Sequence, residues 1–131
     1  MTLDEYIQLA REPIKKFCID HLPDYERPMP THPGKQNLSG GKKVHTLQVI
    51  DKALELNQEF GEQDIIETCL VHDIRNCESL ELLPHQRLAI AATKGKAVYE
   101  DWRHTPYYRF VVLILIADMW SAFINIQDRV K

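Results

Sequence analysis

One stretch of the sequence decides the fold: Phe110-Val-Val-Leu-Ile-Leu-Ile-Ala-Asp118-Met-Trp120, an apolar run with a single charged residue in it. In a helix, Val111, Ile114 and Asp118 share one face, which directs the carboxylate toward the core. An unpaired buried carboxylate costs several kcal/mol, so it needs a cation, a metal or a proton as its partner. The run therefore predicts both a buried helix and a charged site on it.

The rest of the chain also shows helical spacing of its apolar residues. The pair Thr2 and Glu5 indicates a capping box at the start of the chain, and Pro13 a break or kink soon after it. A Pro-rich loop is expected over residues 22–40, and the position of His32 in that loop is the only argument for giving this residue a role. Helices are expected over about residues 1–21, 41–60, 62–73, 80–92, 97–103 and 107–128.

No segment alternates apolar and polar residues as a strand does. The sequence therefore predicts an all-α fold, a single compact domain over residues 1–131 with about six helices. Residues 1–21 would form its N-terminal helix, residues 22–40 its Pro-rich loop and residues 41–128 the helical core that carries the site.

Composition narrows the class of protein. The 131 residues are 44% hydrophobic and 27% charged, as in an ordinary globular domain, and the formal net charge of -3 argues against duplex nucleic acid as a partner. The longest apolar run is too short for a membrane span, and the sequence shows no signal-peptide pattern. Three cysteines without a C-x-x-C pair argue against a disulfide framework. These features predict a cytoplasmic protein.

Two histidines and two aspartates lie on three of the expected helices. They occur in the order His45, then His72-Asp73, then Asp118. Adjacent residues of a helix point about 100° apart, so one ion held by both His72 and Asp73 must lie near a helix end. Imidazole and carboxylate together suit Mn, Fe, Co, Ni or Zn, and we keep Mg as an alternative. A bound divalent ion acidifies its water and neutralises a phosphoryl oxygen, which fits phosphate-ester hydrolysis.

This arrangement resembles the HD superfamily of metal-dependent phosphohydrolases, over roughly residues 38–125. The matching segments are Gly40-Gly-Lys-Lys-Val-His45-Thr-Leu-Gln-Val, Cys69-Leu-Val-His72-Asp73-Ile and Leu115-Ile-Ala-Asp118-Met-Trp-Ser-Ala. The resemblance implies a helical HD-like bundle with His45, His72, Asp73 and Asp118 as ligands of one divalent metal. It also implies hydrolysis of a nucleotide, of the nucleotidase or nucleoside triphosphate hydrolase type.

The chain departs from the family pattern in two places. Many HD proteins continue as His-Asp-x-Gly-Lys, whereas this chain reads His72-Asp73-Ile-Arg75-Asn76. Thr93 stands where some two-metal members have a histidine, so one metal is expected, while His85 and His104 leave a second metal open. The alternatives are an alarmone or cyclic-nucleotide hydrolase, a non-catalytic module of the same fold that binds a nucleotide or a protein, and a structural helical domain. Whether the chain forms a homo-oligomer stays open.

The residues near the His-Asp pair supply candidates for catalysis and substrate binding. Asp73 could hold the metal and orient the nucleophile, and Arg75 could grip phosphate oxygens with its guanidinium. Glu78 is a candidate general acid or base. Lys94 and Lys96 are candidates for binding substrate phosphate. Arg75, Lys94 and Lys96 could instead belong to a solvated surface.

Overall fold

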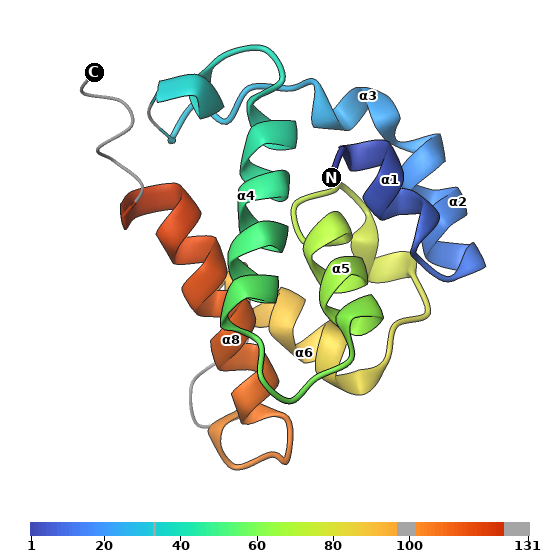
Figure 1. Ribbon diagram of the computed structural model, residues 1–131, viewed down its shortest axis with the longest axis vertical. Coiled ribbons are helices and arrows are strands. Elements are labelled where there is room, and N and C mark those ends of the chain that lie inside the picture. The colour runs from blue at the N-terminus through green and yellow to red at the C-terminus, as the bar shows by residue number, and fades with distance from the viewer. Residues whose placement is uncertain (33, 97–101, 125–131) are drawn as a thin grey trace.

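The computed structural model describes residues 1–32, 34–96 and 102–124. The regular structure in these ranges is helical (Figure 1). The α-helices are α1 (Leu3–Gln8), α2 (Glu12–Asp20), α3 (Leu22–Tyr25), α4 (Gly41–Leu56), α5 (Glu62–Val71), α6 (Pro84–Thr93) and α8 (Tyr108–Met119). Short helical turns are η1 (Gly34–Asn37), η2 (Cys77–Ser79) and η3 (Trp120–Ile124), the last of them a turn of π-helix. The predicted all-α fold is confirmed: these ranges contain seven α-helices and no strand.

The N-terminal part differs from the single helix expected over residues 1–21. The capping box is present, since Glu5 N–H donates to Thr2 Oγ1 at 3.2 Å and Thr2 N–H donates to Glu5 Oε1 at 2.9 Å. The helix ends at Gln8, however, and α2 begins at Glu12 with Pro13 in its first turn. Proline is well placed there, because first-turn N–H groups have no partner within the helix.

The expected Pro-rich loop over residues 22–40 also contains helix, namely α3 at its start and the short turn η1 further along. Pro23 lies in the first turn of α3, and the last residue of that helix, Tyr25, is fully buried. Its hydroxyl donates to the carbonyl of Leu70 at 2.7 Å, which attaches the loop to α5. The remainder of the segment passes through η1 and reaches α4 at Gly40, whose φ of 79° suits a glycine.

Helix α4 stands in the middle of the bundle, with α8 on one side and α5 on the other, and α6 packs against α8 (Figure 1). The facing sides are fully buried at residues such as Ile50, Ile65 and Ile114. Residues 110–117 supply the buried stripe that the sequence predicts, although Ile116 and then Met119 face outward. None of the helices in the described ranges is long and apolar enough to cross a bilayer.

The C-terminal half follows the expected order of helices. The helix expected near residues 80–92 is α6, which starts at Pro84. Residues 97–101 of the expected helix over 97–103, and residues 125–128 of the last expected helix, lie outside the described residues. Within the described part, the last helix ends its α-helical geometry at Met119 and continues as η3.

Candidate metal centre

Three helices bring the four predicted metal ligands together. His45 lies in the second turn of α4, Asp118 lies near the end of α8, and His72 and Asp73 follow directly after the end of α5 at Val71. Because the helix has ended at Val71, the side chains of the adjacent residues His72 and Asp73 can both face the same point. One ligand atom from each of these four residues, which together form the tetrad, lies within 4.8 Å of the others, and the group could hold a metal ion.

The distances between these atoms match the edges of a metal coordination shell. Nε2 of His45 lies 2.9 Å from Asp118 Oδ1 and 3.2 Å from Asp73 Oδ2. Nε2 of His72 lies 3.2 Å from Asp118 Oδ1 and 3.1 Å from Asp73 Oδ2, and the two Nε2 atoms are 3.4 Å apart. Ligands about 2.0–2.2 Å from one ion are roughly 2.9–3.5 Å apart at right or tetrahedral angles. These five separations therefore fit one central ion.

The hydrogen bonds on the far side of each imidazole leave Nε2 available to an ion. His72 Nδ1–H donates to the carbonyl of Cys69 at 2.7 Å, and a carbonyl can only accept. His45 Nδ1–H donates to Ser121 Oγ at 2.9 Å. Asp73 Oδ2 is buried and lacks an aligned hydrogen bond, although two Nε2 atoms lie close to it. Lone pairs that converge in this way fit a cation at their centre.

The four residues strongly perturb one another's proton affinity. Burial raises the pKa of Asp118, but hydrogen bonds from His45 and His72 outweigh it and lower that pKa to about 2. Burial likewise raises the pKa of Asp73, yet the imidazoles of His72 and His45 lower it overall. Burial lowers the pKa of His72, but Asp73 and Asp118 raise it well above its usual value, and the pKa of His45 is raised by the same carboxylates. Without an ion, the mutual contacts therefore favour the ionised form of the carboxyl groups and the protonated form of the imidazoles.

Metal binding is therefore expected to release protons and to become tighter as the pH rises. Because their pKa values are raised, the two imidazoles have to give up protons in order to bind an ion, and these protons leave as the pH climbs through those values. Each proton displaced should tighten Mn²⁺ binding by about tenfold per pH unit. Titration calorimetry in two buffers of different ionisation enthalpy measures the released protons. An affinity equal at pH 6 and pH 8 would contradict the prediction.

A polar network behind His45 orients that ligand. Ser121 in η3 accepts from His45 Nδ1–H and donates to Gln48 Oε1 at 2.9 Å. The buried amide of Gln36, in η1, lies 3.0 Å from both Gln48 Oε1 and the carbonyl of Ser121. Outer partners of this kind fix the tautomer and direction of a ligating imidazole. The network therefore belongs to the candidate metal centre.

Replacing Ser121 by alanine is expected to weaken Mn²⁺ binding by roughly 10–100-fold, because His45 loses the acceptor that fixes its tautomer. The helical content should stay unchanged. Ser39→Ala is the control, because this serine is exposed and its hydroxyl donates to the carbonyl of Glu26, which is not part of the tetrad. Calorimetric titration of both variants with Mn²⁺ measures the effect. Equal affinities for the two variants would show that the hydroxyl does not support the ligand.

His32 also lies beside the candidate metal centre, a position that the sequence did not predict. Its Nδ1–H donates to Gln36 Oε1 at 2.7 Å, and its ring meets the ring of His45 edge-on with centroids 5.0 Å apart. Neither His32 nor Gln36 lies in a regular pattern that would have indicated this position. Ser121 could have been found, because it follows Asp118 by three residues and so shares its helix face.

The predicted substrate residues lie around a depression of about 450 Å³ next to the tetrad. Asp73, Arg75, Glu78 and Lys94 all line it. Lys96 is not among its lining residues, but its Nζ lies 3.6 Å from Glu78 Oε1. Glu78 Oε1 accepts from Lys94 Nζ at 2.9 Å, and this contact lowers the pKa of the exposed Glu78 to about 2. A carboxyl group with so low a pKa is ionised at neutral pH and is a poor proton donor.

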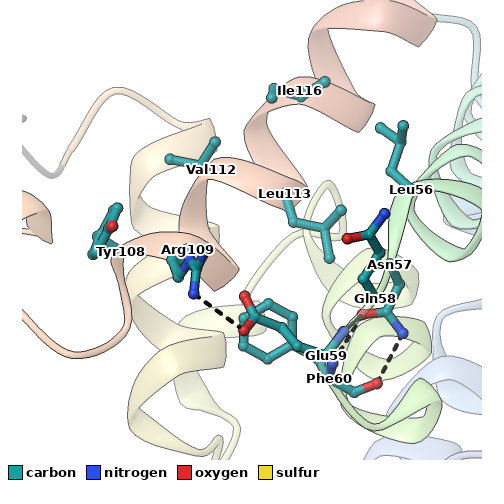
Figure 2. Close-up of a pocket in the computed structure, with 10 residues that line it drawn as sticks. All are labelled: Leu56, Asn57, Gln58, Glu59, Phe60, Tyr108, Arg109, Val112, Leu113 and Ile116. Carbon is teal, nitrogen blue, oxygen red and sulfur yellow. Dashed lines mark hydrogen bonds and ion pairs between the residues drawn. The ribbon is translucent and has the colours of Figure 1, made fainter.

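A larger depression, of about 540 Å³, lies between the end of α4 and the first half of α8 (Figure 2). Its walls are mainly apolar, with Leu56, Phe60, Val112 and Ile116 among them, and an Arg109–Glu59 ion pair of 3.4 Å crosses its rim. It contains none of the four tetrad residues. The smaller, charged depression is therefore the one that adjoins the tetrad, through Asp73.

Fold and site together define an all-helical protein with a candidate metal centre. Comparison with family models, with curated proteins and with solved structures gives no significant match to this chain. The convergence of His45, His72, Asp73 and Asp118 is thus the main observation from which a function can be inferred.

Proposed function

We propose that the chain is a metal-dependent phosphohydrolase of the HD type that removes phosphate from a nucleotide. The observation that carries this proposal is the meeting of two imidazoles and two carboxylates from three helices in the order His, His-Asp, Asp. Within the described residues it is the one group of three or more potential ligands. We therefore propose a single divalent ion, held by His45, His72, Asp73 and Asp118.

The residues around the tetrad support phosphate chemistry. A divalent ion there would supply Lewis acidity and an acidified water. Asp73 both belongs to the tetrad and lines the charged depression, so its carboxylate can orient a water against a phosphate bound there. Arg75, on the same wall, can hold the phosphate oxygens. In the hydrolysis, the water oxygen bonds to phosphorus, the bond from phosphorus to the leaving oxygen breaks, and a proton from the water ends on that oxygen.

A second candidate is a non-catalytic module of the same fold that binds a nucleotide or a protein. The observation that favours it is the ion pair of Glu78 with Lys94, because Glu78, the candidate general acid, is then ionised and cannot protonate a leaving group. Bound metal without turnover would support this module.

Phosphate release from a nucleotide panel tests the proposal. Wild type should hydrolyse at least one nucleoside mono- or triphosphate with Mn²⁺ or Co²⁺, and Asp73→Ala should lose activity by about a thousandfold or more, because ligand and orienting group are removed together. Asp4→Ala, at an exposed carboxylate of α1, is the control and should match wild type. Equal activity in Asp73→Ala and wild type would exclude the tetrad as the active site.

A further inference from the structure

Helix α8 is apolar on its outer side as well as on its core side. Arg109 and Asp118 are the only charged residues among its twelve, and Asp118 belongs to the tetrad. One side of α8 packs against α4 and α6, whereas the opposite side lies at the edge of the bundle (Figure 1). A helix that is apolar all round is normally buried all round. The outer side of α8 is therefore expected to bind a partner.

The apolar residues on this outer side form one continuous stripe, which we call the outer stripe: Tyr108, Val112, Ile116, Met119 and, in η3, Phe123. At 3.6 residues per turn, they lie within about 80° of one another around the helix and cover about 20 Å of its length. Val112 is half-buried, and the other four are between 43% and 63% exposed. A contiguous apolar surface of this kind marks an interaction site.

The outer stripe borders an apolar groove. The depression of about 540 Å³ between α8 and the end of α4 has Leu56 and Phe60 in its walls, and Tyr108, Val112 and Ile116 stand along its α8 side (Figure 2). Two helices pack when the ridge of side chains on one lies in a groove beside the other. A two-fold axis would place the ridge of each copy in the groove of the other. One chain therefore carries both halves of a contact with a second copy of itself.

Charged residues beside the outer stripe favour an antiparallel contact. Near the start of α8, Arg109 forms its ion pair with Glu59. Near the end of α8, Lys52 Nζ lies 4.4 Å from the centre of the Trp120 ring and 3.1 Å from Glu55 Oε2. A two-fold axis perpendicular to α8 reverses one copy, so it brings the first ion pair of each copy opposite the second ion pair of the other. Each pair contains both signs of charge, so opposite charges can meet across the contact.

A second copy fits the outer stripe better than a lipid surface does. Helices that lie on membranes are rich in lysine and arginine beside their apolar face. The two ion pairs beside the outer stripe instead balance two cations with two carboxylates. Four large side chains that are about half exposed supply on the order of 400–500 Å² of contact area per copy. The groove and the charged flank would supply the remainder of the roughly 800 Å² that a standard interface buries on each partner.

We propose that the outer stripe is the interface of a homodimer, in which two copies of α8 pack antiparallel about a two-fold axis near Ile116. The axis lies there because Ile116 is the middle residue of the stripe, so Tyr108 of one copy faces Phe123 of the other. None of the tetrad residues belongs to the stripe, so this inference does not depend on the proposed hydrolase.

The molar mass of the full chain in solution tests the dimer. Gel filtration with light scattering should show a dimer at micromolar concentration. Ile116→Glu should raise the dissociation constant by at least about 100-fold, because the axis brings two buried carboxylates together. Ile19→Glu on α2 is the matched control and should stay dimeric, because Ile19 is 47% exposed and Ile116 48%. Circular dichroism checks that both variants keep their helical content.

Disulfide cross-linking tests the antiparallel arrangement. The three native cysteines are buried, so an introduced surface cysteine is the reactive one. Ile116→Cys should cross-link to a second copy of itself on oxidation, because the residue on the axis meets its own equivalent. Tyr108→Cys alone should not cross-link, but a mixture of Tyr108→Cys and Phe123→Cys should.

The other outcomes would overturn the proposal in distinct ways. A chain that is monomeric throughout the micromolar range, or a dimer that persists in Ile116→Glu, would show that the stripe is not the interface. Equal loss of the dimer in Ile19→Glu would show that the effect is not specific to the stripe. A monomer that sediments with vesicles of phosphatidylserine and phosphatidylcholine, and is released by Ile116→Glu, would assign the stripe to a lipid surface. Cross-linking of Tyr108→Cys to itself would show a parallel contact and reject the antiparallel one.

Discussion

Replacing His72 by alanine is expected to abolish stoichiometric binding of a divalent ion, whereas replacing His85 by alanine leaves it unchanged. Nε2 of His72 lies 3.2 Å or less from carboxylate oxygens of both Asp73 and Asp118, so its removal opens the coordination shell. His85 Nε2 also contacts a carboxylate, Asp64 at 2.9 Å, but this pair has no third ligand in the described residues. Metal binding by the two variants therefore distinguishes a histidine of the proposed ligand set from a histidine in an ordinary His–Asp contact.

Metal content after gel filtration, with a thermal shift in Mn²⁺, measures this difference. Binding to the folded state alone stabilises it by about 2.7 kcal/mol when the free ion is a hundredfold above Kd, so wild type and His85→Ala should melt at a higher temperature in Mn²⁺. His72→Ala should show no shift. Because His72 is fully buried, Asp118→Asn provides a second variant that keeps the side-chain volume. Stoichiometric Mn²⁺ in both variants would disprove the metal centre.

The sequence predicted the parts of this site that lie on regular helices. The spacing of Val111, Ile114 and Asp118 along the last helix was sufficient to place a carboxylate beside the core. The same reasoning placed His72 and Asp73 near the end of α5, since two adjacent residues can reach one ion only from a helix end. Periodicity is local information, and these positions depend on local structure.

The parts that the sequence did not predict depend on contacts between distant segments. Gln36 lies in an irregular stretch, and the residue that it supports, Ser121, is 85 positions further along the chain. His32 reaches the ring of His45 only because η1 packs against α4. The break of the first helix before Arg11 is likewise linked to a distant residue, because Arg11 N–H donates to Glu67 Oε2 at 2.7 Å. No local pattern encodes such pairings.

The contact between Arg11 and Glu67 leads to the largest expected change in stability. Glu67 is fully buried in α5, and its carboxylate accepts from the backbone and the guanidinium of Arg11 and from Gln86 Nε2 at 3.0 Å. Arg11→Ala leaves the carboxylate buried without its cation. We expect this variant to lose about 3–5 kcal/mol of unfolding free energy at pH 7. Lys16→Ala, which breaks the exposed pair with Asp20, should cost about 1 kcal/mol or less.

The pH dependence of that loss identifies its cause. In the wild type, burial raises the pKa of Glu67, but the hydrogen bonds from Arg11 outweigh it and lower the pKa below its unfolded value. Glu67 therefore stabilises the fold at a pH above its pKa in the unfolded chain, which is about 4.3. This contribution declines as the pH falls through its pKa in the folded protein. Without Arg11, burial dominates and raises the pKa of Glu67, so the variant gains stability when Glu67 is protonated.

Urea unfolding measures the effect. The difference in unfolding free energy between wild type and Arg11→Ala should shrink from pH 7 to pH 4, and adding Glu67→Gln to Arg11→Ala should recover part of the lost stability. A difference that stays constant with pH would show that lost packing, and not the uncompensated charge, destabilises the variant.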